Sequence, residues 1–162
     1  MGSADCRPLA SRVRLAAAAL ALAAAAPLAA TVWSRSTETL RLPKGGRAEL
    51  TDVSYTARDW SASITALEVR SVPVPPGVRG EVASVWTFHY TNSDREPHYV
   101  LLSVRCLDGQ RKERASFKAP LTLLADRPSG GKAEVAVRAR ESDWQASTTV
   151  KVVADFVSGP EG

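Results

Sequence analysis

The sequence predicts an all-β protein, an antiparallel β-sandwich of the immunoglobulin-like type. From Glu38 onward, apolar and polar residues alternate with a period of two, which is the pattern of strands that turn one face toward a core. Clusters of Gly, Pro, Asn and Asp interrupt the alternation repeatedly. No crossover helix is indicated between the interruptions, and short strands joined in this way favour a sandwich. A small β-barrel is the alternative architecture.

The expected strands follow the alternation, with boundaries good to about 2–4 residues. They cover residues 38–42, 47–57, 60–71, 81–91, 98–107, 113–118, 121–125, 132–140 and 146–156. Three of the intervening segments, 73–80, 92–97 and 126–131, are rich in turn-forming residues. Because the loops of a sandwich gather at its two ends and carry recognition, these three are the candidate contact loops.

The first thirty residues differ in composition from the rest and predict a secretory signal peptide over 1–30. Arg7, Arg12 and Arg14 precede the alanine-rich apolar stretch LAAAALALAAAAPLAA, and small residues follow at the expected cleavage point near Ala30. An uncleaved membrane anchor is the alternative, but a stable span needs about 20 strongly apolar residues. We therefore expect an exported protein, periplasmic or extracellular, with one domain over 31–156, a flexible tail over 157–162 and no membrane span after cleavage.

The charge balance of the exported part does not suggest nucleic acid as a partner. Without the Asp5, Arg7, Arg12 and Arg14 of the signal, 18 Lys and Arg face 16 Asp and Glu, so the net charge is 18 − 16 = +2. The charges are interspersed and do not form a basic run. Cleavage would also remove Cys6 and leave Cys106 alone, in phase with apolar neighbours along its strand, which favours a buried small hydrophobic residue.

A short repeat, D-W-x-A-S-x-T, occurs at Asp59 and again at Asp143. Each copy follows one alternating segment and precedes another, so both are expected to mark the turn of a β-hairpin. Strand phase then directs the indoles of Trp60 and Trp144 toward the core. The functional alternative is a carbohydrate-binding module in which Trp60 and Trp144 are exposed and stack on sugar rings.

Two histidines, His89 and His98, suggest a second alternative, a periplasmic metal-binding protein. Imidazoles combined with nearby carboxylates or a thiolate are ordinary metal ligands. If the strands over 81–91 and 98–107 pair as a hairpin, however, His98 points into the core and His89 points outward. The leading expectation is therefore no metal, no cofactor and no catalytic residue, and no catalytic motif with the required spacing is present.

Between residues 87 and 137, turn residues recur between the alternating segments, namely Asn92, Asp94, Asp108, Gly109, Gly130 and Gly131. Through these residues the segment 87–137 resembles exported immunoglobulin-like modules of the FxLyD type. The resemblance implies a bacterial β-sandwich of the cell envelope or the extracellular space without known catalytic residues. Together with the predicted signal, it leads us to expect a non-enzymatic exported protein that binds or scaffolds a protein or cell-envelope partner.

Overall fold

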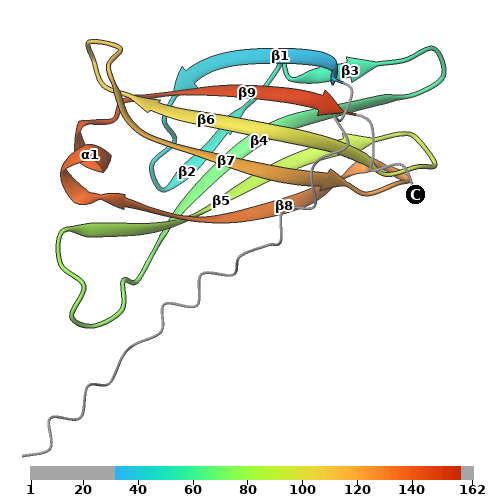
Figure 1. Cartoon of the computed structure of the whole chain (residues 1–162). Coiled ribbons are helices and arrows are strands. Elements are labelled where there is room, and N and C mark those ends of the chain that lie inside the picture. Colours follow the sequence, from blue (N-terminus) through green and yellow to red (C-terminus); the bar gives the residue numbers. More distant parts are fainter. Residues whose placement is uncertain (1–31, 158–162) are drawn as a thin grey trace, which may run out of the picture.

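The computed structural model describes residues 32–157, so the predicted signal peptide and residues 158–162 of the predicted tail lie outside the described residues. Two antiparallel sheets face each other (Figure 1). The four-stranded sheet has the order β1-β9-β6-β7, and the five-stranded sheet has the order β2-β4-β5-β8 with β3 also paired to β4. The elements are β1 (Val32–Arg41), β2 (Gly46–Glu49), β3 (Ser54–Thr56), β4 (Ser61–Val72), β5 (Glu81–Asn92), β6 (His98–Leu107), β7 (Glu113–Leu123), β8 (Arg127–Arg140), α1 (Glu141–Ala146) and β9 (Thr149–Val157).

The chain passes repeatedly from one sheet to the other. β4–β5 and β6–β7 are hairpins within a sheet, whereas β1 to β2, β5 to β6, β7 to β8 and β8 to β9 each connect the two layers. The two sheets remain separate and do not close on each other. The predicted β-sandwich is confirmed, and the alternative of a small barrel is wrong.

Alternation of burial along the strands places the core between the sheets. The largest fully buried side chains come from both layers: Trp86, Phe88 and Tyr90 from β5, Ile64 and Leu67 from β4, and Phe156 from β9. Removing this apolar surface from water is the main favourable contribution to the fold. Val157, predicted to begin the tail, is the last residue of β9 and is buried.

Two predicted strand divisions differ from the structure. The segment 47–57 is not one strand, because the backbone leaves the sheet between β2 and β3. There the amides of Thr51 and Asp52 donate hydrogen bonds to the Glu38 carboxylate, at 2.9 and 3.0 Å. Conversely, 113–118 and 121–125 form the single strand β7, which runs through Pro120. Proline is tolerated there because β7 is at the edge of its sheet.

The expected loop over 126–131 is also wrong, because β8 begins at Arg127. Its Gly and Pro residues are compatible with an edge strand, and the register with β5 shifts between Tyr90 and Asn92 to accommodate them. Gly130 has a φ of 114°, a conformation that side chains rarely adopt. The candidate contact loop is therefore reduced to a short turn before β8.

The two Asp-Trp copies take different structures. The first copy precedes β4, and the amide of Ala57 donates to the carbonyl of Trp60 in the turn from β3, as a hairpin requires. The second copy lies in α1, where the chain crosses from β8 to β9, and these two strands lie in different sheets. The prediction of two hairpins is wrong for Asp143, because this turn must change layer and not reverse within one.

Candidate functional site

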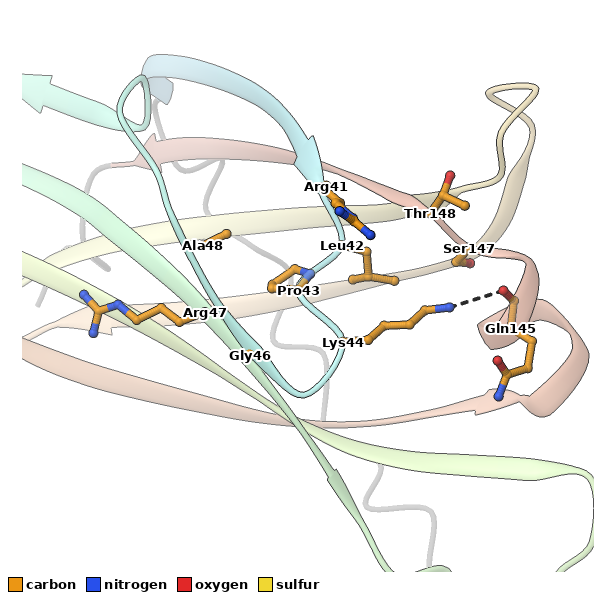
Figure 2. A pocket seen from close by; sticks show the side chains of 10 residues that line it. All are labelled: Arg41, Leu42, Pro43, Lys44, Gly46, Arg47, Ala48, Gln145, Ser147 and Thr148. Atoms are coloured by element: carbon orange, nitrogen blue, oxygen red, sulfur yellow. Dashed lines mark hydrogen bonds between the residues drawn. The ribbon is translucent and has the colours of Figure 1, made fainter.

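A surface cavity of about 550 Å³ lies where the β1–β2 turn meets the end of α1. Its volume falls within the usual range of ligand pockets, about 300–1,000 Å³. We call it the basic pocket. Figure 2 shows the lining residues: Arg41, Leu42, Pro43, Lys44, Gly46, Arg47 and Ala48 from one side, and Gln145, Ser147 and Thr148 from the other. Three cations and two hydroxyl groups therefore surround one hollow.

Lys44 holds the two walls of the basic pocket together. Its Nζ donates to the carbonyl oxygens of Trp144 and Gln145, at 2.5 and 3.2 Å, and lies 5.3 Å from the centre of the Trp144 ring. Those carbonyls belong to the end of α1, where a cation interacts favourably with the helix dipole. Partial burial lowers the pKa of Lys44 from its usual value, while the two carbonyl oxygens stabilise the charged form.

The backbone fixes the same junction. The amide of Leu42 donates to the carbonyl of Thr148 at 3.0 Å, and the amide of Gly46 donates to that of Pro43 at 3.0 Å. On the other wall, at the end of α1, the hydroxyl of Ser147 donates to the carbonyl of Asp143 at 2.7 Å. The basic pocket is thus built on hydrogen-bonded backbone from two distant parts of the chain.

The two arginines of the basic pocket are exposed and differ in their partners. Arg47 pairs with Glu49, Nε to Oε1 at 2.9 Å, and the two side chains are 48% and 66% exposed. An exposed pair of this kind contributes little, about 0–1 kcal/mol. Arg41 makes no ion pair with another described residue. Both guanidinium groups are thus available to an anionic ligand at small cost.

His98 and Trp60 meet in an aromatic cluster between the sheets. The imidazole and the indole stack with centroids 3.8 Å apart and planes 14° apart. Tyr55 lies 5.2 Å from Trp60, and the partly exposed Trp33 lies 5.7 Å from His98. His98 is buried in the core phase, as predicted.

The buried imidazole of His98 has a polar partner in Asp94. Its Nε2 donates to the Asp94 carboxylate at 2.8 Å. Although desolvation raises the pKa of Asp94, hydrogen bonds from His98 and from the amides of Arg95 and Glu96 hold it below its usual value. The pair satisfies a polar ring inside an apolar cluster, which burial requires.

His89 is on the outer side of the other sheet. Its Nε2 lies 3.2 Å from the Glu68 carboxylate, and its ring is partly covered. The prediction that the two histidines point to opposite sides holds, but the hairpin on which it was based is wrong, because β5 and β6 lie in different sheets. Among residues 32–157, no group of three or more His, Cys, Asp and Glu is placed to hold a metal ion.

The two tryptophans of the repeat do not share a site. Trp60 belongs to the aromatic cluster, while Trp144 is 7% exposed and packs edge-on against Trp86 at 6.4 Å. Both contact the core, as predicted, although Trp144 does so from α1 and not from a strand. A sugar site that uses Trp60 and Trp144 together does not form.

Cys106 is buried at 3% exposure, which confirms that it packs as a small hydrophobic residue. Burial raises the pKa of its thiol to about 11, with nearby Lys44 opposing the shift.

Of the predicted contact loops, 73–80 lies beside α1, since the amide of Glu141 donates to the carbonyl of Gly80. Loop 92–97 touches the β7–β8 turn, where the amide of Asp126 donates to the carbonyl of Asp94.

No protein-family model matches the chain, and no curated protein matches it. One solved structure to which the chain is similar is the enzymatically active domain of tailspike protein 4 from bacteriophage CBA120. The identity is 14% and the TM-score 0.26, and the match covers 82% of this chain and 18% of that chain. The described residues contain no helix long and apolar enough to cross a membrane.

No sequence pattern predicts the basic pocket. Its residues come from 41–48 and 145–148, and neither of these two segments is unusually rich in charged residues. The only local signal is the turn PKGG, which places a lysine between a proline and two glycines. Lys44 lies in the pocket wall because it donates to the carbonyls of α1, a short helix that the sequence pattern does not predict.

Proposed function

We propose that this protein is an exported, non-enzymatic β-sandwich that binds a partner in the bacterial cell envelope or outside the cell, and that the basic pocket receives an anionic group of that partner. The predicted signal peptide and the resemblance to FxLyD-type modules support the location. The observation that carries the proposal is the basic pocket itself, with Arg41, Lys44 and Arg47 around one cavity. Carboxylate, phosphate and sulfate groups are the ligands that such a set of cations recognises.

The roles inside the basic pocket divide between positioning and recognition. Lys44 is engaged with the carbonyls of α1 and sets the shape of the pocket. Arg41 and Arg47 are on the rim, where an incoming anion replaces water or the weak Glu49 contact. A rim of exposed arginines changes the association rate and the salt dependence of binding more than the fold.

The test is purification of the protein from its producing cells under non-denaturing conditions, followed by mass spectrometry of everything retained. We expect a chain that begins near residue 31 and a partner that is released at high salt, because screening weakens exposed charge contacts. The double variant R41E/R47E should lose the partner, while the control R58E, an exposed arginine in the β3–β4 turn, should retain it.

Two results would contradict the proposal. Retention of the same partner by R41E/R47E at wild-type level would place binding elsewhere on the molecule. An intact N-terminus together with a stoichiometric metal would support an anchored metal-binding protein in its place.

A further inference from the structure

The free edge of β8 differs from the other sheet edges that the structure describes. Natural proteins protect edge strands with short length, proline, bulges or charged side chains, and the outer face of β8 uses the last of these. β2 and β3 are only 4 and 3 residues long, β7 contains Pro120, and β1 pairs with β9 in unbroken register only from Ser34 to Arg41. β8 has 14 residues; its Pro128 and its register shift lie before Gly131, and from Gly131 to Arg140 it pairs with β5 in unbroken register. Its other side therefore presents a long, regular row of backbone groups.

The core-facing side of β8 is only partly covered. Ala133, Val135 and Val137 pack against the core but are partly exposed, unlike the central residues of β5 beside them. Phe117 of the nearby edge strand β7 is also partly buried. An apolar seam thus runs along the same edge whose backbone pairs with no further described strand, and an added strand would cover both.

The charges at the centre of the outer face of β8 allow a register in which opposite charges face each other. Lys132, Glu134, Ala136, Arg138 and Arg140 alternate with the core-facing residues. In an antiparallel pair of two β8 strands centred on Ala136, Glu134 of each copy stands directly opposite Arg138 of the other. On the core side, Val135 then stands opposite Val137. Opposite charges and β-branched residues in such cross-strand positions stabilise a sheet.

We infer that the partner for the β8 edge is a second copy of this chain, with β8 pairing to β8 about a two-fold axis at Ala136. The two five-stranded sheets then become one continuous sheet. Such an isologous contact closes on itself and does not propagate into a fibre. The inference is independent of the basic pocket, whose residues belong to other elements.

The registers on either side differ from this one in their charge pairs and in the length of their overlap. A shift of the axis to Val135 sets Lys132 opposite Arg138, a like-charge pair that destabilises a sheet. A shift to Val137 pairs Glu134 with Arg140 and sets no like charges of β8 opposite each other, but it leaves Arg138 opposite Ala136 and reduces the overlap from residues 132–140 to residues 134–140. In the register centred on Ala136, Lys132 stands opposite Arg140, and Glu81 lies beside Arg140 in the β5 register to offset that charge.

Sedimentation equilibrium of the purified protein and its charge variants tests the interface. Wild type should form a dimer, and E134R or R138E alone should weaken it by roughly tenfold or more, because each change makes two repulsive cross-strand pairs by symmetry. The double variant E134R/R138E should restore the dimer, since it exchanges the charges and keeps them opposite. Thermal unfolding of each variant checks that the fold is intact.

Disulfide trapping tests the register separately. Only the residue on the two-fold axis stands opposite its own copy, at a Cα separation of about 4.5–5.5 Å, within the range of a disulfide. Oxidised A136C should therefore form a covalent dimer, and K132C, on the same face, should not. A monomer at every accessible concentration would overturn the inference, as would equal cross-linking of A136C and K132C.

Discussion

Replacing Gly131 by alanine should destabilise the protein because the ring of Tyr90 occupies the place of the new methyl group. A Cβ at residue 131 would lie 2.6 Å from Tyr90 Oη and closer still to Cζ of the ring. The ring is buried at 1% exposure, and its Oη accepts a hydrogen bond from the amide of Leu124 at 3.1 Å. The ring therefore cannot move aside without disturbing both the core and that bond.

The expected cost follows from these contacts. Overpacking a filled core costs about 1–3 kcal/mol, and loss of the Tyr90–Leu124 hydrogen bond adds about 0.5–1.5 kcal/mol. The reduced entropy of the unfolded chain offsets about 0.4–1 kcal/mol. We expect Gly131→Ala to lower the free energy of unfolding by about 0.5–4 kcal/mol.

Denaturant unfolding measures this loss, and two variants show its cause. Gly109→Ala is the matched control, because a Cβ there meets no atom within 4 Å, and it should change stability by no more than about 0.5 kcal/mol. In a Tyr90→Leu background the ring is gone, so Gly131→Ala should cost less by about 1 kcal/mol or more. A wild-type midpoint for Gly131→Ala, or an unchanged cost in the Tyr90→Leu background, would refute the steric explanation.

Three further predictions concern single side chains. Lys44→Met keeps the apolar stem but removes the ammonium from the α1 carbonyls, and should cost about 1–2 kcal/mol in denaturant unfolding; unchanged stability would refute the positioning role. Cys106, with its pKa raised by burial to about 11, should stay unmodified by a thiol reagent at pH 8 and react only after unfolding; rapid native labelling would contradict this. The pKa of Asp108 is lowered by hydrogen bonds from the amides of Lys112 and Gln110 and from the Arg114 guanidinium. The carboxylate therefore stabilises the fold above its unfolded pKa, near 4, and this stabilisation is lost as the pH falls below that value. Acid unfolding of Asp108→Asn should lack this part of the pH dependence, and a profile identical to wild type would argue against it.

The strands were predictable because alternation reports which side chains face the core, whichever strand lies beside them. This explains why His98 was correctly expected inside and His89 outside, although β5 and β6 do not pair. In a sandwich both layers turn one face inward, so the phase of a strand is informative even when its assumed neighbour is wrong. Sheet order was not predictable in this way, since alternation carries no information about pairing.

Features set by distant contacts were not predictable. The sequence ESDWQA is too short to show helical periodicity, and α1 is stabilised from outside by Lys44, a hundred positions earlier. The basic pocket depends on the same contact between Lys44 and α1, so the sequence does not predict it either. The glycines before Lys132 predict a loop, whereas in the structure Gly131 lies in β8 and leaves room for the ring of Tyr90.

The most direct test of the central claim is to map anion binding on the protein by amide chemical shifts. The probe is a polyglutamate peptide, titrated at low and at high salt. We predict shifts that cluster at Lys44, Gly46, Ser147 and Thr148, weaken with salt and vanish in R41E/R47E. Shifts centred on loop 92–97 would contradict the assignment of the basic pocket as the binding site. So would the absence of shifts at polyglutamate concentrations that saturate binding to a basic control peptide.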